Sequence, residues 1–490
     1  MSVSTASLPS DDAEADSKFV CFACVGDSFL SDVIQKSGEQ QTCSYCHTTQ
    51  AAMGIEQFAD HVEGAFDRHY RRTSTEPDDY EYMLLRDRES NYDWDRHGEP
   101  VVPAIASAAE VNEPIAEDAQ RILEERHADF DSAAIGEECE FADDSYYEEK
   151  RANDVELQHA WESFETSLKT QSRFFNKDAE AVLTSLFDGL ANHKTVDSKR
   201  VVIDIGPGKR IKSLYRARVF QSDKVLEPAM MRPDRELGPA PTDVASGGRM
   251  NARGISVFYG ALTPEVALAE IRPPVGSRVM IGKFAVMRPL KILDVEALQS
   301  VLVRGSIFDS GFIGKLERAR FLRRLSDRIT RPVMPNDEPS DYLITQAIAD
   351  YLAGQARLDG ILYPSAQVTT AKKNKNIALF HPSSRVESLQ IPPDTELSAH
   401  TYTNYEEGPE PDYSVSEITT DPKPAPRPTP QGPYFFPGLP YEDDDPEPRP
   451  VTLQLELDSL EVRHIEAVSF KTAKHKVRRY RFSRSDFEKL

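Results

Sequence analysis

The stretch that most restricts the fold is residues 247–272, in which a loop, a strand and a helix follow one another directly. Residues 255–262 are apolar on both faces, which predicts a buried strand. Thr263, Pro264 and Glu265 then supply a hydroxyl N-cap, a proline at the first helical position and a carboxylate in the first turn. This run therefore predicts a strand–turn–helix unit, and with it a sheet flanked by helices.

Three polar side chains fall on this unit: Arg249 in the glycine-flanked loop, Tyr259 near the end of the strand, and Glu270 two turns into the helix. A guanidinium, a phenol and a carboxylate held at one place can bind and cleave a phosphorylated glycoside. The alternative is an ordinary strand with a buried tyrosine, in which Glu270 only caps the helix or pairs with Arg249.

Further blocks accompany this unit in a fixed order. They are Leu214–Arg218, the loop Gly248-Arg249-Met250-Asn251, the segment from Tyr259 to the Ala-Leu-Ala-Glu that ends at Glu270, Tyr363-Pro364-Ser365, and the strand Asn376–Phe380. Over roughly residues 210–390 the set resembles the RES family, bacterial toxin-type domains named for an Arg, a Glu and a Ser. Two departures concern the shape of the pocket: Met250 stands where the family has an aromatic residue, and residues 235–246 form a long loop.

The resemblance implies an α+β fold with an ADP-ribosyltransferase-like mixed β core, and an activity on NAD as substrate. The reaction splits the nicotinamide–ribose bond by hydrolysis, by phosphate attack or by ADP-ribosyl transfer. Loss of nicotinamide leaves an oxocarbenium-like ribose, which a carboxylate stabilises. We therefore expect Glu270 to act on the ribose, and Arg249, with Arg216 second, to hold the pyrophosphate.

The same resemblance implies roles for three other residues. Tyr259 is expected to stack on the nicotinamide or orient it. Ser365 is expected to hydrogen-bond the ribose or the nicotinamide amide, and Asn251 to take part in binding the dinucleotide. A nucleophilic Ser365 is disfavoured because no histidine base stands in a matching block.

The resemblance also implies a toxin or defence effector with a neutralising partner, commonly an Xre-type helix-turn-helix protein. An alternative from another class is a RES-fold module without catalysis, which binds a protein or RNA through its N-terminal region. The two differ in whether the protein takes up NAD at all.

Four cysteines near the N-terminus have the spacing C-x2-C-x18-C-x2-C: Cys21, Cys24, Cys43 and Cys46. This spacing falls in the range of a closed, structural zinc site of four thiolates. Disulfides and a redox pair are the alternatives, and both fit less well in a reducing compartment without a βαβ context. Cys139 is solitary, and we expect no role for it.

The pattern along the chain divides it into six segments. We expect disorder over 1–18, a zinc-binding segment over 19–48, a helical domain over 49–195, the RES domain over 196–391, a Pro-rich acidic linker or strap over 392–450, and C-terminal strands over 451–490 that return to the RES sheet. Strands are predicted at 201–205, 213–220, 255–262, 278–287 and 290–295, and helices at 113–129, 264–271 and 341–357. Residues 303–340 are Arg-rich and partly helical, which suggests a lid, a partner surface or a connector.

Some RES proteins carry a HEPN-like N-terminal extension, and HEPN ribonucleases use an arginine and a histidine. Arg121 and His127 are the candidates here, but surface roles are favoured, and we treat the helical domain as non-catalytic.

Composition bears on partners. The net charge is −23, which disfavours non-specific binding to nucleic acid or to anionic membrane. The apolar fraction of 39% is below the roughly 45–50% of globular chains, so we expect part of the chain not to pack. No apolar run reaches the roughly 18 residues of a membrane span, and the first residues lack a signal-peptide pattern. We expect a cytoplasmic protein.

Overall fold

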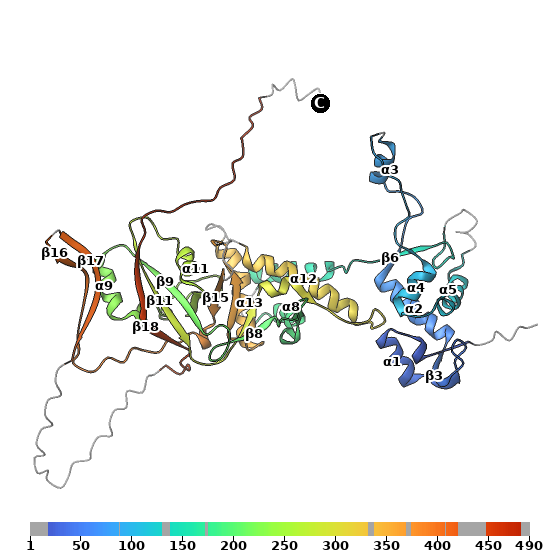
Figure 1. Ribbon diagram of the computed structural model, residues 1–490, viewed down its shortest axis with the longest axis horizontal. Coiled ribbons are helices and arrows are strands. Elements are labelled where there is room, and N and C mark those ends of the chain that lie inside the picture. The colour runs from blue at the N-terminus through green and yellow to red at the C-terminus, as the bar shows by residue number, and fades with distance from the viewer. Residues whose placement is uncertain are drawn as a thin grey trace, which may run out of the picture. The chain divides into compact units, whose positions relative to one another are not determined.

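The computed structural model describes residues 18–87, 89–129, 138–171, 175–331, 338–368, 374–406, 408–419 and 447–481. The chain forms two compact units (Figure 1). The first comprises residues up to 201 together with 297–328, and the second comprises 202–296 and the residues from 329 onward. Of the segment expected to be disordered, residues 1–17 lie outside the described residues.

The first unit combines short strands with helices. Its strands are β1 (Phe19–Cys21), β2 (Glu39–Thr42), β3 (Thr49–Gly54), β4 (Tyr70–Arg72), β5 (Glu99–Pro100), β6 (Tyr146–Glu149), β7 (Lys194–Thr195) and β13 (Val301–Leu302). Its helices are η1 (Phe22–Cys24), α1 (Ser28–Ser37), α2 (Ile55–His69), α3 (Asp79–Arg86), α4 (Val101–Ala109), α5 (Glu113–His127), α7 (Val155–Thr170), α8 (Lys177–Phe187), η2 (Leu190–Asn192), η3 (Glu296–Ser300) and α12 (Phe312–Thr330). The helix predicted at 113–129 is confirmed, whereas residues 49–54, expected to be helical, form β3.

Helix α2 shows why this unit packs. Phe58, Val62 and Phe66 recur at helical spacing and are all buried. They pack with residues of α1, α4 and α5 in one apolar core. The strand order β1-β3-β2 places the cysteine-bearing segment beside that core.

Helix α12 belongs mainly to the first unit. Phe321 lies 5.6 Å from Trp161 of α7, measured between ring centroids. Arg320 and Arg324 both pair with the buried carboxylate of Asp154, at 3.3 and 3.2 Å. The Arg-rich residues that suggested a lid or a connector are therefore a packed helix of the first unit.

The second unit is built on a mixed sheet of eight strands in the order β18-β11-β9-β10-β15-β14-β12-β8. The strands are β8 (Val202–Ile205), β9 (Ser213–Phe220), β10 (Phe258–Ala261), β11 (Arg278–Val286), β12 (Leu290–Asp294), β14 (Gly360–Pro364), β15 (Lys375–Leu379) and β18 (Leu453–His464). Only the β12–β14 pair is parallel. The predicted strands at 213–220, 278–287 and 290–295 are confirmed, and the one at 255–262 is shortened to β10.

Helices cover both faces of this sheet. They are α9 (Asp223–Met231), α10 (Pro233–Glu236), α11 (Pro264–Glu270), α13 (Glu338–Gly354) and η4 (His381–Ser383). The side chains of β9 point alternately to the two faces of the sheet. Leu214 packs with Leu226 of α9 on one face, and Ala217 packs with Val266 of α11 on the other. The expected mixed α+β core with flanking helices is confirmed.

The prediction that residues 392–450 form a linker without strands is partly wrong. Residues 396–418 form an antiparallel pair, β16 (Glu396–Tyr405) and β17 (Gly408–Ile418). Strand β17 contains Pro409 and Pro411. It tolerates them because it pairs with β16 on one edge only, and an N–H group missing from an edge strand costs little. The densest prolines, at 422–430, and the aromatic run at 434–436 lie outside the described residues.

The chain then returns to the sheet through β18, which pairs with β11 from Val286↔Leu453 to Arg278↔His464. In Figure 1 the red β18 lies beside β11, with the green β9 on the other side of β11, although the paired residues of β11 and β18 are 167 to 186 positions apart in the sequence. No second strand follows within residues 465–481.

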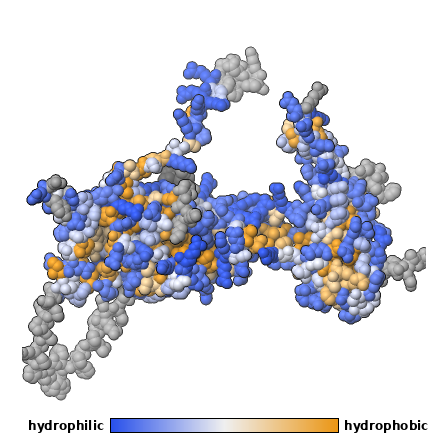
Figure 2. Space-filling view, viewed as in Figure 1, coloured by the Kyte–Doolittle hydropathy of each residue, from blue (hydrophilic) through white to orange (hydrophobic). Residues whose placement is uncertain are grey.

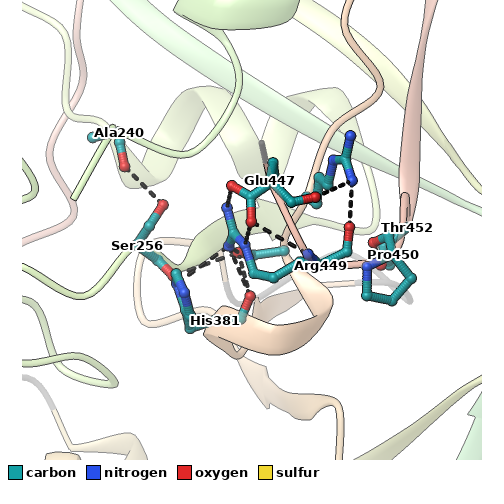
Figure 3. A network of polar contacts seen from close by, with 9 residues as sticks. Ala240, Ser256, His381, Glu447, Arg449, Pro450 and Thr452 are labelled. Atoms are coloured by element: carbon teal, nitrogen blue, oxygen red, sulfur yellow. Dashed lines mark hydrogen bonds and ion pairs between the residues drawn. The ribbon is translucent and has the colours of Figure 1, made fainter. Parts of the chain in front are cut away.

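A polar network fastens the residues just before β18 (Figure 3). Glu447 receives two hydrogen bonds of 2.7 Å from the guanidinium of Arg449. The same guanidinium donates to the carbonyl of His381 and to the hydroxyl of Ser384. Arg385 in turn donates to the carbonyls of Glu447 and Arg449. The entry into β18 is therefore held by side chains of the turn after β15.

No helix in the described part of the chain is long and apolar enough to cross a membrane. Figure 2 shows hydrophilic residues over much of the visible surface, in agreement with the net charge of −23.

Candidate active site

The strand–turn–helix unit forms as its sequence predicts. The hydroxyl of Thr263 accepts a hydrogen bond from the N–H of Val266 at 3.3 Å, and Pro264 occupies the first helical position. The helix α11 is seven residues long and ends at Glu270, which is exposed. This short helix therefore carries the carboxylate of Glu270 out over the sheet.

Ser365 meets that carboxylate. The serine is buried and directly follows β14, and its Oγ donates to Oε1 of Glu270 at 2.6 Å. The same Oγ accepts from the N–H groups of Gln367 at 3.1 Å and Val368 at 3.4 Å. Because backbone donors occupy the lone pairs of the hydroxyl, its proton is left for the glutamate. Two motif blocks 95 positions apart thus meet through this contact.

Tyr259 and Asn251 are also joined. The phenol of Tyr259 donates to Oδ1 of Asn251 at 2.7 Å and accepts from the N–H of Met250 at 2.9 Å. Burial raises the pKa of Tyr259. The amide nitrogen of Asn251 is shared among three carbonyls of the loop, those of Ser246, Ala252 and Ile255. The side chain of Asn251 therefore organises the loop, and it is not among the residues that line the cleft described below.

Arg249 differs from the sequence prediction. Its Nη1 donates to the carbonyl of Ile329 at 2.8 Å and its Nη2 to the carbonyl of Arg331 at 2.9 Å. These carbonyls stand at the C-terminal end of α12, where unpaired carbonyl groups attract a cation. The guanidinium expected on the pyrophosphate thus binds a helix end, and Arg249 does not line the cleft.

Arg216 instead supplies a cation that forms no ion pair with the residues that the structure describes. It lies on β9 with its guanidinium carbon 5.2 Å from the ring centroid of Phe258 on β10. Its Nη1 is buried and has no hydrogen-bond partner among the described residues. Burial lowers the pKa of Arg216 to about 10, and the nearby charge of Arg218 acts in the same direction. An anionic ligand here would relieve this cost.

A cleft opens where the sheet forks. Strands β9 and β10 share one register pair, Ala261↔Tyr215, whereas β9 and β11 share eight. Gly260 stands at the fork, and a Cβ there would approach the ring of Phe258 to 2.7 Å, so the position requires glycine. The cleft has a volume of about 290 Å³, near the lower end of the roughly 300–1,000 Å³ typical of ligand pockets. Its lining consists of Tyr215, Arg216, Ala217, Tyr259, Gly260, Ala261, Ala267, Glu270, Ile271, Tyr363 and Asn376.

Of the residues predicted from sequence, the structure thus places Arg216, Tyr259 and Glu270 in this cleft and joins Ser365 to it through Glu270. Sequence reasoning missed Tyr215, Tyr363 and Asn376 as lining residues. The sequence signal for Tyr363 is its position in the Tyr-Pro-Ser block, two positions before Ser365. Residues two positions apart on a strand point to the same face, so Tyr363 and Ser365 are expected to lie on one face of the sheet. Burial raises the pKa of Tyr363, with the charge of Glu270 acting in the same direction.

The four cysteines of the first unit form a second candidate site. The sulfur atoms of Cys21, Cys24, Cys43 and Cys46 lie within 4.8 Å of one another. The Sγ distance is 3.6 Å between Cys21 and Cys46 and 3.8 Å between Cys24 and Cys43. A tetrahedral ion bound at about 2.3 Å has edges of about 3.8 Å, so the set fits such an ion. These distances exceed a disulfide bond, and all four thiols are free.

Groups around the thiols hold the cluster. The amide of Gln50 donates to the sulfur of Cys21 at 2.8 Å. Tyr45, between the last two cysteines, donates to Asp118 of α5 at 2.9 Å, and Lys18 pairs with the same carboxylate at 2.6 Å. The cysteine cluster is therefore tied to the helices of the first unit.

The ribonuclease candidates do not converge. Arg121 pairs with Asp118 at 3.2 Å, and His127 pairs with Glu63 at 2.7 Å. Six positions on α5 place the two side chains on different sides of the helix. Each therefore contacts an acidic side chain of its own.

Two family models match parts of the chain. The family model of the RES domain matches residues 213–400, which include every residue that lines the cleft. The chain carries a RES domain. Ahead of the RES domain, residues 36–182 match the model of HEPN/RES N-terminal domain 1. The four-cysteine cluster lies only partly within this second match, because Cys21 and Cys24 precede residue 36.

Among solved structures, the RES-bearing chain is similar to the crystal structure of the M. tuberculosis MbcT–MbcA toxin–antitoxin complex. The sequence identity is 14%, the match covers 35% of this chain and 74% of that chain, and the TM-score is 0.19. No curated protein matches the sequence.

Proposed function

We propose that the RES domain cleaves the nicotinamide–ribose bond of NAD in the cleft between β9 and β10. The observation that carries the proposal is the meeting of Glu270, Ser365 and the unpaired Arg216 around one cavity. An acid and a cation in one cleft match a ligand with an anionic pyrophosphate and a sugar that becomes cationic.

The proposed reaction assigns one task to each group. The ring nitrogen of bound NAD is already cationic, so nicotinamide departs as a neutral molecule with the bonding electron pair and needs no acid. The ribose becomes oxocarbenium-like, and the carboxylate of Glu270 stabilises it. In hydrolysis, water adds its oxygen to C1′ and releases a proton; phosphate or an acceptor group takes the place of water in phosphorolysis or transfer.

Arg216 and Tyr259 would bind the substrate. Arg216 offers Nη1 to a phosphate oxygen, which gives this buried donor its missing partner. Tyr259 lines the cleft, and its phenol is fixed by the loop of Asn251, so its ring presents a rigid face. Arg249 keeps the loop against the end of α12 and acts on the substrate only if its two hydrogen bonds break.

Ser365 is proposed as a positioning residue. Its hydroxyl contacts Glu270, while the backbone N–H groups of Gln367 and Val368 fix its direction. It would hold the carboxylate in one place, and this role differs from the substrate contact that the sequence suggested.

For the cysteine cluster we propose zinc, held by Cys21, Cys24, Cys43 and Cys46 with no position left for a substrate. Four free thiols also suit a reducing compartment, which supports a cytoplasmic location. When bound, the ion would supply folding energy to the N-terminal segment and no chemistry.

A toxin or defence role and an Xre-type neutralising protein complete the proposal, since both accompany the RES resemblance. The net charge of −23 does not favour nucleic acid as the ligand of this domain.

The test is the release of nicotinamide from NAD by the full chain, with products identified by mass in the presence and absence of phosphate. Glu270→Gln should reduce the rate at least about a hundredfold, the scale of one lost electrostatic stabiliser. Glu265→Gln, on the same helix and exposed, is the matched control and should leave the rate unchanged. Equal rates in the wild type and Glu270→Gln contradict the assignment.

A further inference from the structure

A row of four side chains crosses the floor of the cleft. The register pairs Tyr363 with Asn376, Asn376 with Ala261, and Ala261 with Tyr215. Residues paired across neighbouring strands point to the same face, so all four project toward the face that α11 covers. Each of them lines the cleft. Four strands about 4.8 Å apart give the row a length of about 14 Å.

Asn376 is the one amide in this row. It is 3% exposed, and its side chain makes no hydrogen bond to the residues that the structure describes. Its amide nitrogen and oxygen are not among the fully enclosed polar atoms that lack a partner, so they open onto the cleft and leave donors and an acceptor for a ligand. The cleft is the direction from which a partner can reach it. Such a side chain is suited to a ligand group that both donates and accepts.

The position of Asn376 fixes which part of a dinucleotide it meets. Ser365 follows β14 two positions after Tyr363, and it holds Glu270 at 2.6 Å, so the carboxylate lies at the Tyr363–Asn376 end of the row. Arg216 lies on β9 next to Tyr215, at the other end of the row. Its side chain alternates with that of Tyr215 and contacts the ring of Phe258 on the opposite face, and it lines the cleft where the sheet forks. With phosphates at Arg216 and the reacting ribose at Glu270, the leaving base lies over Tyr363 and Asn376.

We propose that Asn376 recognises the carboxamide of nicotinamide and makes the cleft selective for the amide over the acid form of the dinucleotide. This inference rests on the proposed cleavage of NAD. A carboxamide donates one hydrogen bond and accepts another. The amide of Asn376 can pair with both groups, because its oxygen accepts and its nitrogen donates. A nicotinate carboxylate has acceptors only, so its second oxygen faces the oxygen of Asn376.

The experiment measures kcat/KM of the full chain for NAD and for nicotinic acid adenine dinucleotide. The wild type should prefer NAD by about tenfold or more, the scale of one or two hydrogen bonds. Asn376→Ala should lower kcat/KM for NAD by a similar factor and leave the acid form nearly unchanged, so that the preference disappears. Asn376→Asp, of the same shape, should lose NAD turnover too. Asn404→Ala, an exposed residue of β16, is the matched control.

An equal loss on both dinucleotides, or full NAD turnover by Asn376→Ala, overturns the inference. If Asn376→Ala does not fold, as judged by circular dichroism, Asn376→Asp decides alone, and full NAD turnover by that variant overturns the inference. A wild type that cleaves neither dinucleotide refutes the proposed function, and calorimetry with free nicotinamide and nicotinate then decides the inference separately. Tighter binding of nicotinamide, abolished in the variant, supports it, and equal binding of the two refutes it.

Discussion

Arg216 gives a prediction in which stability and ligand binding change in opposite directions. We consider Arg216→Met, because methionine is unbranched, apolar and of similar length. If Arg216 is held in the cleft for an anionic substrate, its burial costs the free protein stability. Removing the charge should then stabilise the protein and abolish NAD binding.

The magnitude follows from the surroundings of the guanidinium. Burial lowers the pKa of Arg216 from 12.5 to about 10, which corresponds to a desolvation cost of at most roughly 3 kcal/mol. The side chain is only half-buried, so solvent reduces this cost, and the contact with Phe258 returns about 0.5–1 kcal/mol. A net gain of about 1 kcal/mol is expected, or roughly 2–4 °C in Tm for a unit of this size.

The assay is thermal unfolding with and without NAD. The wild type should gain Tm when NAD is added, and Arg216→Met should start higher and gain nothing. Arg210→Met, at an exposed position, serves as the control and should match the wild type within about 0.5 kcal/mol. A lower Tm in Arg216→Met, or an unchanged response to NAD, refutes the reasoning.

Three further predictions concern other parts of the molecule. Ser365→Ala should lower kcat about 10- to 100-fold with KM nearly constant, because the lost hydrogen bond is to Glu270 and not to substrate; steady-state kinetics check this, and a raised KM at constant kcat speaks against it. Cys43→Ser should lose bound zinc, measured by elemental analysis, and expose residues 19–54 to protease; full zinc content in the variant excludes the four-thiolate site. Arg449 holds the pKa of Glu447 at about 2, below its unfolded value, so its stabilisation is present above about pH 4.3 and is lost as pH falls toward 2. Glu447→Gln should flatten the pH dependence of Tm in that window, and identical profiles in both proteins contradict the role of this pair.

Local rules predicted the parts of the site that depend on neighbouring residues. The cap at Thr263 and the proline at Pro264 predicted the start of α11. The spacing of the cysteines predicted a cluster, and their four sulfur atoms lie within 4.8 Å of one another. The motif blocks also brought Glu270 and Ser365 together in advance. These features are encoded within a few positions of sequence or in a shared family pattern.

The failures concern partners that are distant in sequence. Arg249 binds carbonyl groups 80 and 82 positions away, and no periodicity in the loop points to the end of α12. The place of Asn376 in the cleft could not be predicted from sequence, because it depends on the strand register that pairs this residue with Tyr363 and Ala261. The hairpin of β16 and β17 was not predicted, because the proline content of the segment was taken to exclude strands. A strand that pairs with a neighbour on one edge only can contain proline, because its other edge forms no ladder.

The single register pair between β9 and β10 divides the sheet into a three-stranded part and a five-stranded part. The first part carries Arg216, and the second carries Tyr259, Tyr363 and Asn376, so the two ends of the cleft belong to different plates. A change in the angle between the two parts would alter this gap, and the ladder it would disturb is the single register pair between β9 and β10. We expect a dinucleotide that touches both parts to hold them together, and a protein that separates the two parts to inactivate the site.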